Sequence, residues 1–132
     1  PALEFDTKTL IELDNLKEND AVGFTMMGTN YTYIEIKRIN NKLELALYEG
    51  SFNTHDICVF KEEYQDDKII LGLKARNEAI YDLRYQYTVN GKVIEKSYLA
   101  SAGRWIGATY GLFARGNGGN ALVKYFNTTK LK

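Results

Sequence analysis

The chain has 132 residues, of which 45% are hydrophobic and 26% charged, a composition typical of one globular domain with its own core. Seventeen basic residues balance 17 acidic residues, so the charge gives no reason to expect binding to nucleic acid or to an anionic membrane surface. No apolar run approaches the roughly 18 residues that a membrane-spanning helix needs. Tyrosine occurs 10 times and proline once, which favours twisted β-sheets, because aromatic rings pack well on a pleated surface.

In the first half of the chain, apolar and polar residues alternate with the period of two that is typical of strands. Tyr31, Tyr33 and Glu35 are expected on one face of a strand, opposite an apolar face. Asn40 and Asn41 predict a tight hairpin turn. A loop is expected at residues 49–54, and residues 61–68 are expected to be charged and solvated. The strands expected here are residues 9–13, 21–27, 31–39, 43–47 and, at a sheet edge, 57–60.

The second half continues this alternation around one strong turn signal. Asn90-Gly91 predicts a type I′ turn, because both positions need positive φ. Tyr85 and Tyr87 are expected on the same face as Leu83 and Tyr81. A further turn is expected at residues 76–78 and a glycine-rich tip at 115–120. The strands expected here are residues 69–75, 80–89, 92–98, 103–114 and 121–126.

The glycine-spaced segment 103–114 is the most distinctive part of the sequence. Gly103, Gly107 and Gly111 recur every four residues around Trp105. Each glycine costs a helix about 1 kcal/mol relative to alanine, so a strand that lets a ring or another backbone approach is favoured. Roughly nine antiparallel strands without a convincing helix then predict an all-β sandwich or barrel, formed by residues 1–132 as one domain.

Three stretches carry a family pattern: YQYTVNGK at residues 85–92, GRWIGA at 103–108 and GLFA at 111–114. Together they resemble the C-terminal concanavalin A-like sandwich of glycoside hydrolase family 43, the β-xylosidases and α-arabinofuranosidases. Residues 20–24 (DAVGF) and 31–34 (YTYI) are also similar to that family. Lys124 stands where the family usually has an acid, which argues against a metal role there. The residues expected to be structural on this basis are Tyr85, Tyr87, Asn90, Gly91, Gly103, Trp105, Gly107, Gly111 and Phe113.

The resemblance implies a jelly roll that packs on a catalytic β-propeller of the same protein, with the catalytic acids on that propeller. Complete domains of the family run longer at the N-terminus, and this chain starts at Pro1 without a signal peptide. We therefore expect a C-terminal fragment of a larger enzyme, able to self-associate through bared apolar surface. The one cysteine leaves the compartment open between the bacterial cytoplasm and the periplasm or exterior.

Candidate catalytic groups are few. Glycoside hydrolysis needs two carboxyl groups facing one another, and only Glu35 with Asp82, or the fragment Glu12-Leu13-Asp14, offers a pairing; solvated strand charges explain the former equally well. His55 is expected on a surface loop and Cys58 as a buried, inert thiol. One histidine and one cysteine cannot form a zinc site, and a calcium site at Asp66-Asp67 has no further support. No metal or cofactor is expected.

Aromatic rings are the remaining binding signal, because sugar rings stack on them. The candidates for contact with an oligosaccharide or with another domain are Tyr31, Tyr33, Tyr81, Trp105 and Tyr110. Three functions follow: an accessory domain of a hemicellulose-degrading glycoside hydrolase, an autonomous carbohydrate-binding module, or a small ligand-binding β-barrel. The first is favoured by the family resemblance.

Overall fold

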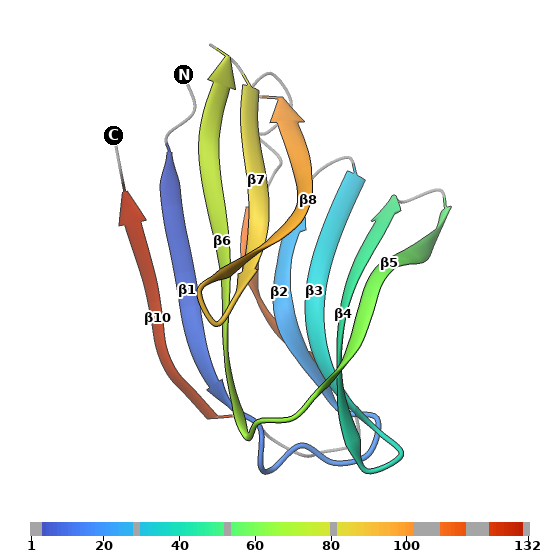
Figure 1. Cartoon of the computed structure of the whole chain (residues 1–132). Coiled ribbons are helices and arrows are strands. Elements are labelled where there is room, and N and C mark those ends of the chain that lie inside the picture. Colours follow the sequence, from blue (N-terminus) through green and yellow to red (C-terminus); the bar gives the residue numbers. More distant parts are fainter. Residues whose placement is uncertain are drawn as a thin grey trace.

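The computed structural model describes residues 4–27, 30–51, 54–79, 82–101, 109–115 and 122–130, with the last two strands described as backbone. The described part contains ten strands in two five-stranded antiparallel sheets (Figure 1). One sheet has the order β10-β1-β6-β7-β8 and the other β5-β4-β3-β2-β9. The strands are β1 Phe5–Glu12, β2 Ala21–Met27, β3 Asn30–Ile39, β4 Lys42–Ser51, β5 Thr54–Tyr64, β6 Lys68–Ala79, β7 Asp82–Val89, β8 Lys92–Ser101, β9 Thr109–Arg115 and β10 Leu122–Lys130.

The core lies between the two sheets and follows directly from the alternation. On β4 the inward series Leu43, Leu45 and Leu47 is buried, and β3 contributes Ile34 and Ile36 opposite the other sheet. A face-to-face pair of sheets with a filled interior is a β-sandwich, so the predicted sandwich is confirmed and the barrel alternative is wrong. The described part of the chain contains no helix long and apolar enough to cross a membrane.

Both predicted hairpin turns have the expected backbone. Asn40 and Asn41 have φ of 52° and 63°, and Asn90 and Gly91 have φ of 52° and 81°. These are the two positive values that a type I′ turn requires. The side chain of Asn90 also accepts a hydrogen bond from the backbone N of Ile70 at 2.8 Å, which ties the turn to β6.

Several strands are longer than predicted. β6 continues through the expected turn at residues 76–78, because Arg76 and Asn77 pair with β7 and the Arg76 guanidinium bonds to Asp6 on β1 at 2.6 Å. β5 extends into the charged residues 61–64, and β4 runs to Ser51. An edge strand exposes its side chains, so charges do not end it; Lys61 lies 3.6 Å from Glu44 of β4.

The glycine-spaced segment is described only in part. Residues 109–115 form β9, which pairs with β2 and places Gly111 opposite Thr25 and Phe113 opposite Gly23. The strand prediction is therefore confirmed for this part. Gly103, Trp105 and Gly107 lie outside the described residues, as does Tyr81.

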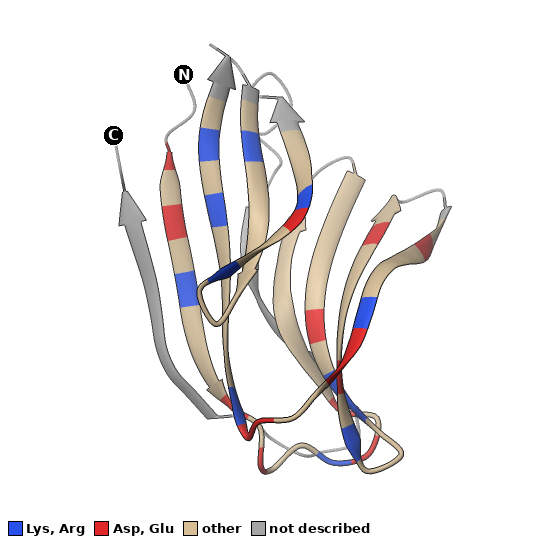
Figure 2. Ribbon diagram, in the orientation of Figure 1, with Lys and Arg blue, Asp and Glu red and all other residues tan. Residues whose placement is uncertain are grey.

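Charges are distributed over both sheets. Figure 2 shows acidic and basic residues interspersed along the ribbon, without a long run of one sign in this view. This agrees with the equal counts of acidic and basic residues in the sequence.

Candidate functional site

One end of the sandwich carries a row of aromatic side chains on the outer face of the β5-β4-β3-β2-β9 sheet. This tyrosine row consists of Tyr31 and Tyr33 on β3 and Tyr48 on β4. The carboxylate of Asp56 on β5 lies beside it. The Tyr33 and Tyr48 rings stack with centroids 4.9 Å apart, and those of Tyr31 and Tyr33 are 6.3 Å apart. Both β3 tyrosines donate their hydroxyl protons to Asp56, Tyr33 at 2.6 Å. The row is thus ordered by one carboxylate on the edge strand.

Gly50 makes this arrangement possible. A Cβ at this position would lie 2.6 Å from Cζ of Tyr31 and 2.5 Å from Oδ1 of Asp56, both too close for ordinary contact. The hydrogen bond to Asp56 raises the pKa of Tyr31, since the carboxylate favours the protonated phenol. Any side chain at residue 50 would therefore push the row apart.

The candidate contact residues are thus only partly brought together. Tyr31 and Tyr33 share the tyrosine row. Tyr110 lies on β9, where it pairs with Met26, and the other two candidates lie outside the described residues. Contact of any of the five with sugar or with another domain stays a prediction.

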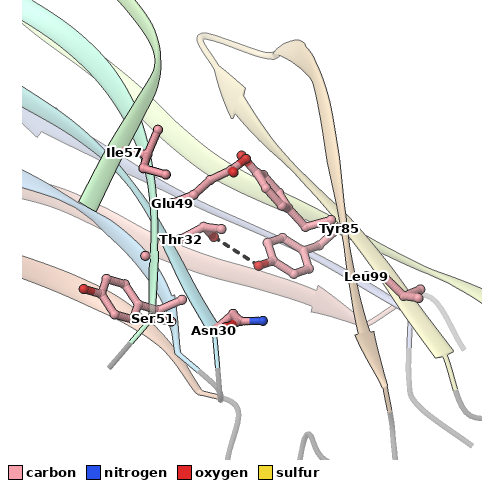
Figure 3. A pocket seen from close by; sticks show the side chains of 10 residues that line it. Asn30, Thr32, Glu49, Ser51, Ile57, Tyr85 and Leu99 are labelled. Atoms are coloured by element: carbon pink, nitrogen blue, oxygen red, sulfur yellow. Dashed lines mark hydrogen bonds between the residues drawn. The ribbon is translucent and has the colours of Figure 1, made fainter. Parts of the chain in front are cut away.

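A second feature, the inter-sheet cleft, opens at the same end of the sandwich. It is a cavity of about 360 Å³ between the ends of β3, β4 and β5 in one sheet and β7 and β8 in the other. Figure 3 shows its labelled side chains, with Thr32 bonded to Tyr85. The residues that line the cleft include Thr32, Glu49, Ile57, Tyr85, Tyr98 and Leu99.

Glu49 brings a carboxylate into this inter-sheet space. It continues the inward series of β4 two residues beyond Leu47, so the strand itself aims it between the sheets. Lys96 Nζ lies 3.6 Å from its Oε2, beyond hydrogen-bond length. The Tyr98 hydroxyl lies against the Glu49 carboxylate; apart from this contact, neither it nor the buried Glu49 Oε2 has a hydrogen-bond partner among the described residues.

Deeper in the cleft, three hydroxyls form a closed chain of hydrogen bonds. The hydroxyl of Tyr87 donates to the Thr32 carbonyl at 3.0 Å, so Thr32 Oγ1, 2.7 Å away, must donate to Tyr87. The Thr32 proton is then used, and the Tyr85 hydroxyl at 3.0 Å must donate to Thr32 Oγ1. Each of the three hydroxyl protons has one acceptor, so these hydroxyls are buried without an unsatisfied donor.

Burial shifts the pKa of the three tyrosines upward. It raises the pKa of Tyr85 to about 12, against a partial opposing effect of the Thr32 hydrogen bond. Burial also raises the pKa of Tyr87, and burial, followed by hydrogen bonding to the Glu49 carboxylate and the charge of that carboxylate, raises the pKa of Tyr98. All three stay neutral hydrogen-bonding groups at ordinary pH.

The candidate catalytic acids are not brought together. Glu35 is buried, not solvated as expected, on the outer face of β3 between Gly23 and Ala46 of the neighbouring strands. Asp82 begins β7 in the other sheet, so the β3 sheet itself separates the pair. Glu12 ends β1.

The two reactive side chains are also placed differently from prediction. Cys58 is exposed on β5, so the expectation of a buried thiol is wrong. β5 is an edge strand, so its side chains are less covered by neighbouring strands, and apolar neighbours in the sequence do not reveal this exposure. His55 is exposed as expected, but on the strand rather than in a loop. Among the described residues, no group of three His, Cys, Asp or Glu side chains is arranged to hold a metal ion, so Asp66 and Asp67 gain no further ligand.

Sequence analysis missed several residues of these two features: Tyr48, Asp56, Glu49 and Tyr98. The signal for Glu49 was available, because extending the Leu43, Leu45, Leu47 series by one step predicts an inward carboxylate. Asp56 had no such signal, since its role depends on which strand pairs with β4.

The described strands form a two-sheet antiparallel β-sandwich with the tyrosine row and the inter-sheet cleft at one end. Residues 1–129 match the family model described as the β-xylosidase C-terminal concanavalin A-like domain. The match covers nearly the whole chain, and the chain belongs to this family.

Solved structures with the same fold are chains of glycoside hydrolase family 43 (GH43). A bifunctional GH43-CE protein of Bacteroides eggerthii matches 99% of this chain with a TM-score of 0.77 at 15% identity, over 18% of its own length. An engineered GH43 hydrolase, described as displaying endo-xylanase and exo-arabinofuranosidase activity, matches 99% with a TM-score of 0.78 at 12% identity, over 30% of its length. The GH43B protein of a Bacteroides ovatus xyloglucan locus matches 98% with a TM-score of 0.66 at 15% identity, over 28% of its length. A search of curated proteins gives no significant match. The chain thus spans less than a third of these solved chains, and at such identities the likeness shows the fold alone.

Proposed function

We propose that this domain is a non-catalytic accessory sandwich of a GH43 glycoside hydrolase acting on xylan- or arabinan-type hemicellulose. In this role it packs against the catalytic β-propeller of the same polypeptide and supports it. The observation that carries the proposal is the family match over residues 1–129. The size of the matched chains supports it, because 70% or more of each lies outside the matched part.

The arrangement of acids is consistent with this role. Glu35 and Asp82 lie in different sheets, and Glu35 faces away from the sandwich interior. A pair of carboxyl groups acting on one glycosidic bond must face each other at about 5 to 9.5 Å. These two residues do not offer that pair, so we assign bond cleavage to the remainder of the polypeptide.

The test compares the full polypeptide with a version that lacks residues 1–132. We expect removal to lower the thermal midpoint of the catalytic part by several degrees and to reduce hydrolysis of aryl β-xylosides or α-arabinofuranosides. If the catalytic part keeps both its midpoint and its kcat/KM, the supporting role is refuted.

A titration separates this role from that of an autonomous binding module. Xylo- and arabino-oligosaccharides are added to the full polypeptide with its catalytic acids removed, and to the same protein carrying Tyr31→Ala with Tyr33→Ala. For an accessory domain, the heat of binding is the same in both. A loss of heat in the tyrosine variant would instead assign sugar binding to the tyrosine row.

A further inference from the structure

Large apolar side chains are exposed on both lips of the inter-sheet cleft. Ile57 on β5 is 60% exposed and Leu99 on β8 is 52% exposed, and both line the cleft. β5 and β8 are the edge strands that flank this opening, one from each sheet. Apolar side chains gathered at the mouth of a cavity are typical of a surface that another protein segment covers.

The polar groups inside the cleft call for a hydrogen-bond donor. Apart from their contact with each other, Glu49 Oε2 and the Tyr98 hydroxyl are buried without a hydrogen-bond partner among the described residues, and no N–H donor reaches the carboxylate within hydrogen-bond length. Leaving such groups unsatisfied is costly, most of all for a charged group. An N–H donor entering the cleft would complete the coordination that Lys96, at 3.6 Å, leaves unfinished.

The ring faces in the cleft are already occupied. Tyr85 and Tyr98 stack on each other with centroids 5.4 Å apart, and Lys96 Nζ lies 5.9 Å from the Tyr98 ring. A sugar ring binds best on a free aromatic face, which these two residues do not present. Branched apolar lips and a carboxylate without an N–H donor within hydrogen-bond length instead fit a polypeptide segment.

The chain enters the domain at the same end as the cleft. Phe5, the first residue of β1, pairs with Ala75, which pairs with Tyr85, which pairs with Tyr98. The first strand residue and the cleft therefore lie in one cross-strand row. Figure 1 shows that β1 begins at the end of the molecule where β3 begins and β8 ends.

We propose that the inter-sheet cleft is the docking socket for the catalytic part of the same polypeptide, which precedes this domain. The docked segment places an apolar residue between Ile57 and Leu99 and an N–H donor, from arginine, lysine or an amide, on Glu49 Oε2. This inference rests on the proposed accessory function and names the surface through which it acts.

The primary test measures thiol labelling in the full polypeptide, in a background where Cys58 and any other cysteine are serine. Cysteine is introduced at the lips by Ile57→Cys and Leu99→Cys. Glu62→Cys on β5 and Lys92→Cys on β8 are exposed controls on the same two strands. Rates are divided by those in urea to remove intrinsic reactivity.

In the domain by itself all four positions are exposed to solvent. A difference in labelling rate between the lips and the controls would therefore come from docking. We expect the two lip cysteines to react at least about tenfold more slowly than the controls in the native polypeptide, as for residues in the dry centre of an interface. Equal normalised rates at lips and controls would overturn the proposal.

A matched pair of substitutions tests the carboxylate. Glu49 and Glu44 lie on the same strand, each 3.6 Å from a lysine Nζ, with 31% and 30% of the side chain exposed. Glu49→Gln should speed labelling of Leu99→Cys by about fivefold, because it removes the charge that the docked N–H donor would meet and so accelerates dissociation. Glu44→Gln, on the outer face, should leave the rate unchanged. An equal effect of both, or of neither, would contradict the role of Glu49.

Other occupants give different outcomes. Protection that grows with protein concentration would assign the cleft to a second copy, and protection only after addition of xylo-oligosaccharide would assign it to sugar; either result overturns the docking proposal. If the lips are unprotected while deletion of the domain still destabilises the catalytic part, the accessory function holds and docking uses another face. If deletion has no effect either, the function itself fails.

Discussion

Two substitutions of Thr32 test the hydrogen bonds among the hydroxyls of Thr32, Tyr85 and Tyr87. Loss of hydrogen bonds and loss of buried apolar surface predict opposite orders of stability for these two variants. Thr32→Val replaces the hydroxyl by a methyl group of nearly the same size, whereas Thr32→Ser keeps the hydroxyl and loses the methyl. Valine deletes the acceptor of the buried Tyr85 proton and the donor to Tyr87, while Tyr87 keeps its bond to the Thr32 carbonyl. The assigned hydrogen bonds therefore predict that Thr32→Val lowers the stability more than Thr32→Ser does.

The expected magnitude follows from the unmet phenol. A buried hydroxyl left without its acceptor costs about 1–3 kcal/mol, so we expect Thr32→Val to lower the free energy of unfolding by about 2 kcal/mol. With an unfolding entropy near 2.1 cal/mol/K per residue, this corresponds to a fall in Tm of roughly 7 °C for a chain of this length. Removing one buried methyl group in Thr32→Ser costs about 1 kcal/mol.

Urea unfolding followed by tyrosine fluorescence measures both variants. In the Tyr85→Phe background, Thr32→Val should lose most of its cost, because the phenol that it orphans is gone. The remaining bond of Tyr87 to the Thr32 carbonyl is unaffected in this background. A valine variant as stable as the serine variant, or an unchanged cost in the double mutant, would refute the assigned hydrogen-bond directions.

Three further predictions concern separate parts of the fold. The pKa of Tyr85 is raised to about 12 in the folded state, above the unfolded value of 10.0, so its contribution is complete below pH 10 and lost as the pH rises through 12. That loss is about 3 kcal/mol at 1.36 kcal/mol per pKa unit, and Tyr85→Phe should flatten the fall in urea midpoint between pH 9 and pH 12. Gly50→Ala should displace the phenol of Tyr31 and return its pKa toward 10.0, seen in an ultraviolet titration, with a stability change below about 1 kcal/mol because the clash is with movable side-chain ends. Arg38→Met should cost about 2 kcal/mol, since it removes donors from two backbone carbonyls, whereas Lys61→Met, which breaks an exposed ion pair with Glu44, should cost less than about 1 kcal/mol; equal losses in urea unfolding would contradict this ranking.

Much of the fold could be predicted from the sequence, because alternation specifies the faces of each strand directly. Ala21–Met27 was predicted to the residue, and the buried faces of β3, β4 and β7 agree with the alternation. The Asn90-Gly91 turn was equally accessible, since few sequences tolerate positive φ at two successive positions. Strand ends were less accessible, because they depend on pairing with distant partners: Arg76 continues β6 through its bond to Asp6, 70 residues away in sequence.

The candidate site could be predicted from the sequence only where it depended on a single strand. Tyr31 and Tyr33 share a face through alternation alone, and their common face is confirmed by their ring contact and shared acceptor. Their acceptor, Asp56, was not predictable, because a bulge in the pairing of β4 with β5 sets its position. Glu35 shows the converse limit: a charged residue at a predicted outward position is buried between Gly23 and Ala46, two small neighbours supplied by other strands.

The two ends of the sandwich are built for different purposes. At one end the connection from β1 to β2 ties the sheets: Arg38 donates to the carbonyls of Leu16 and Leu13 at 2.6 and 3.3 Å, and Glu18 accepts the backbone N–H groups of the β3–β4 turn. Those groups satisfy one another within the chain, and the hydrogen bonds from the turn lower the pKa of Glu18. At the other end, where β1 begins, the Glu49 carboxylate has no N–H donor within hydrogen-bond length among the described residues, and apolar side chains are exposed on both lips. Because a domain that stood alone would gain stability by satisfying or removing these groups, their position beside the entering chain favours an end shaped by contact with the rest of the polypeptide.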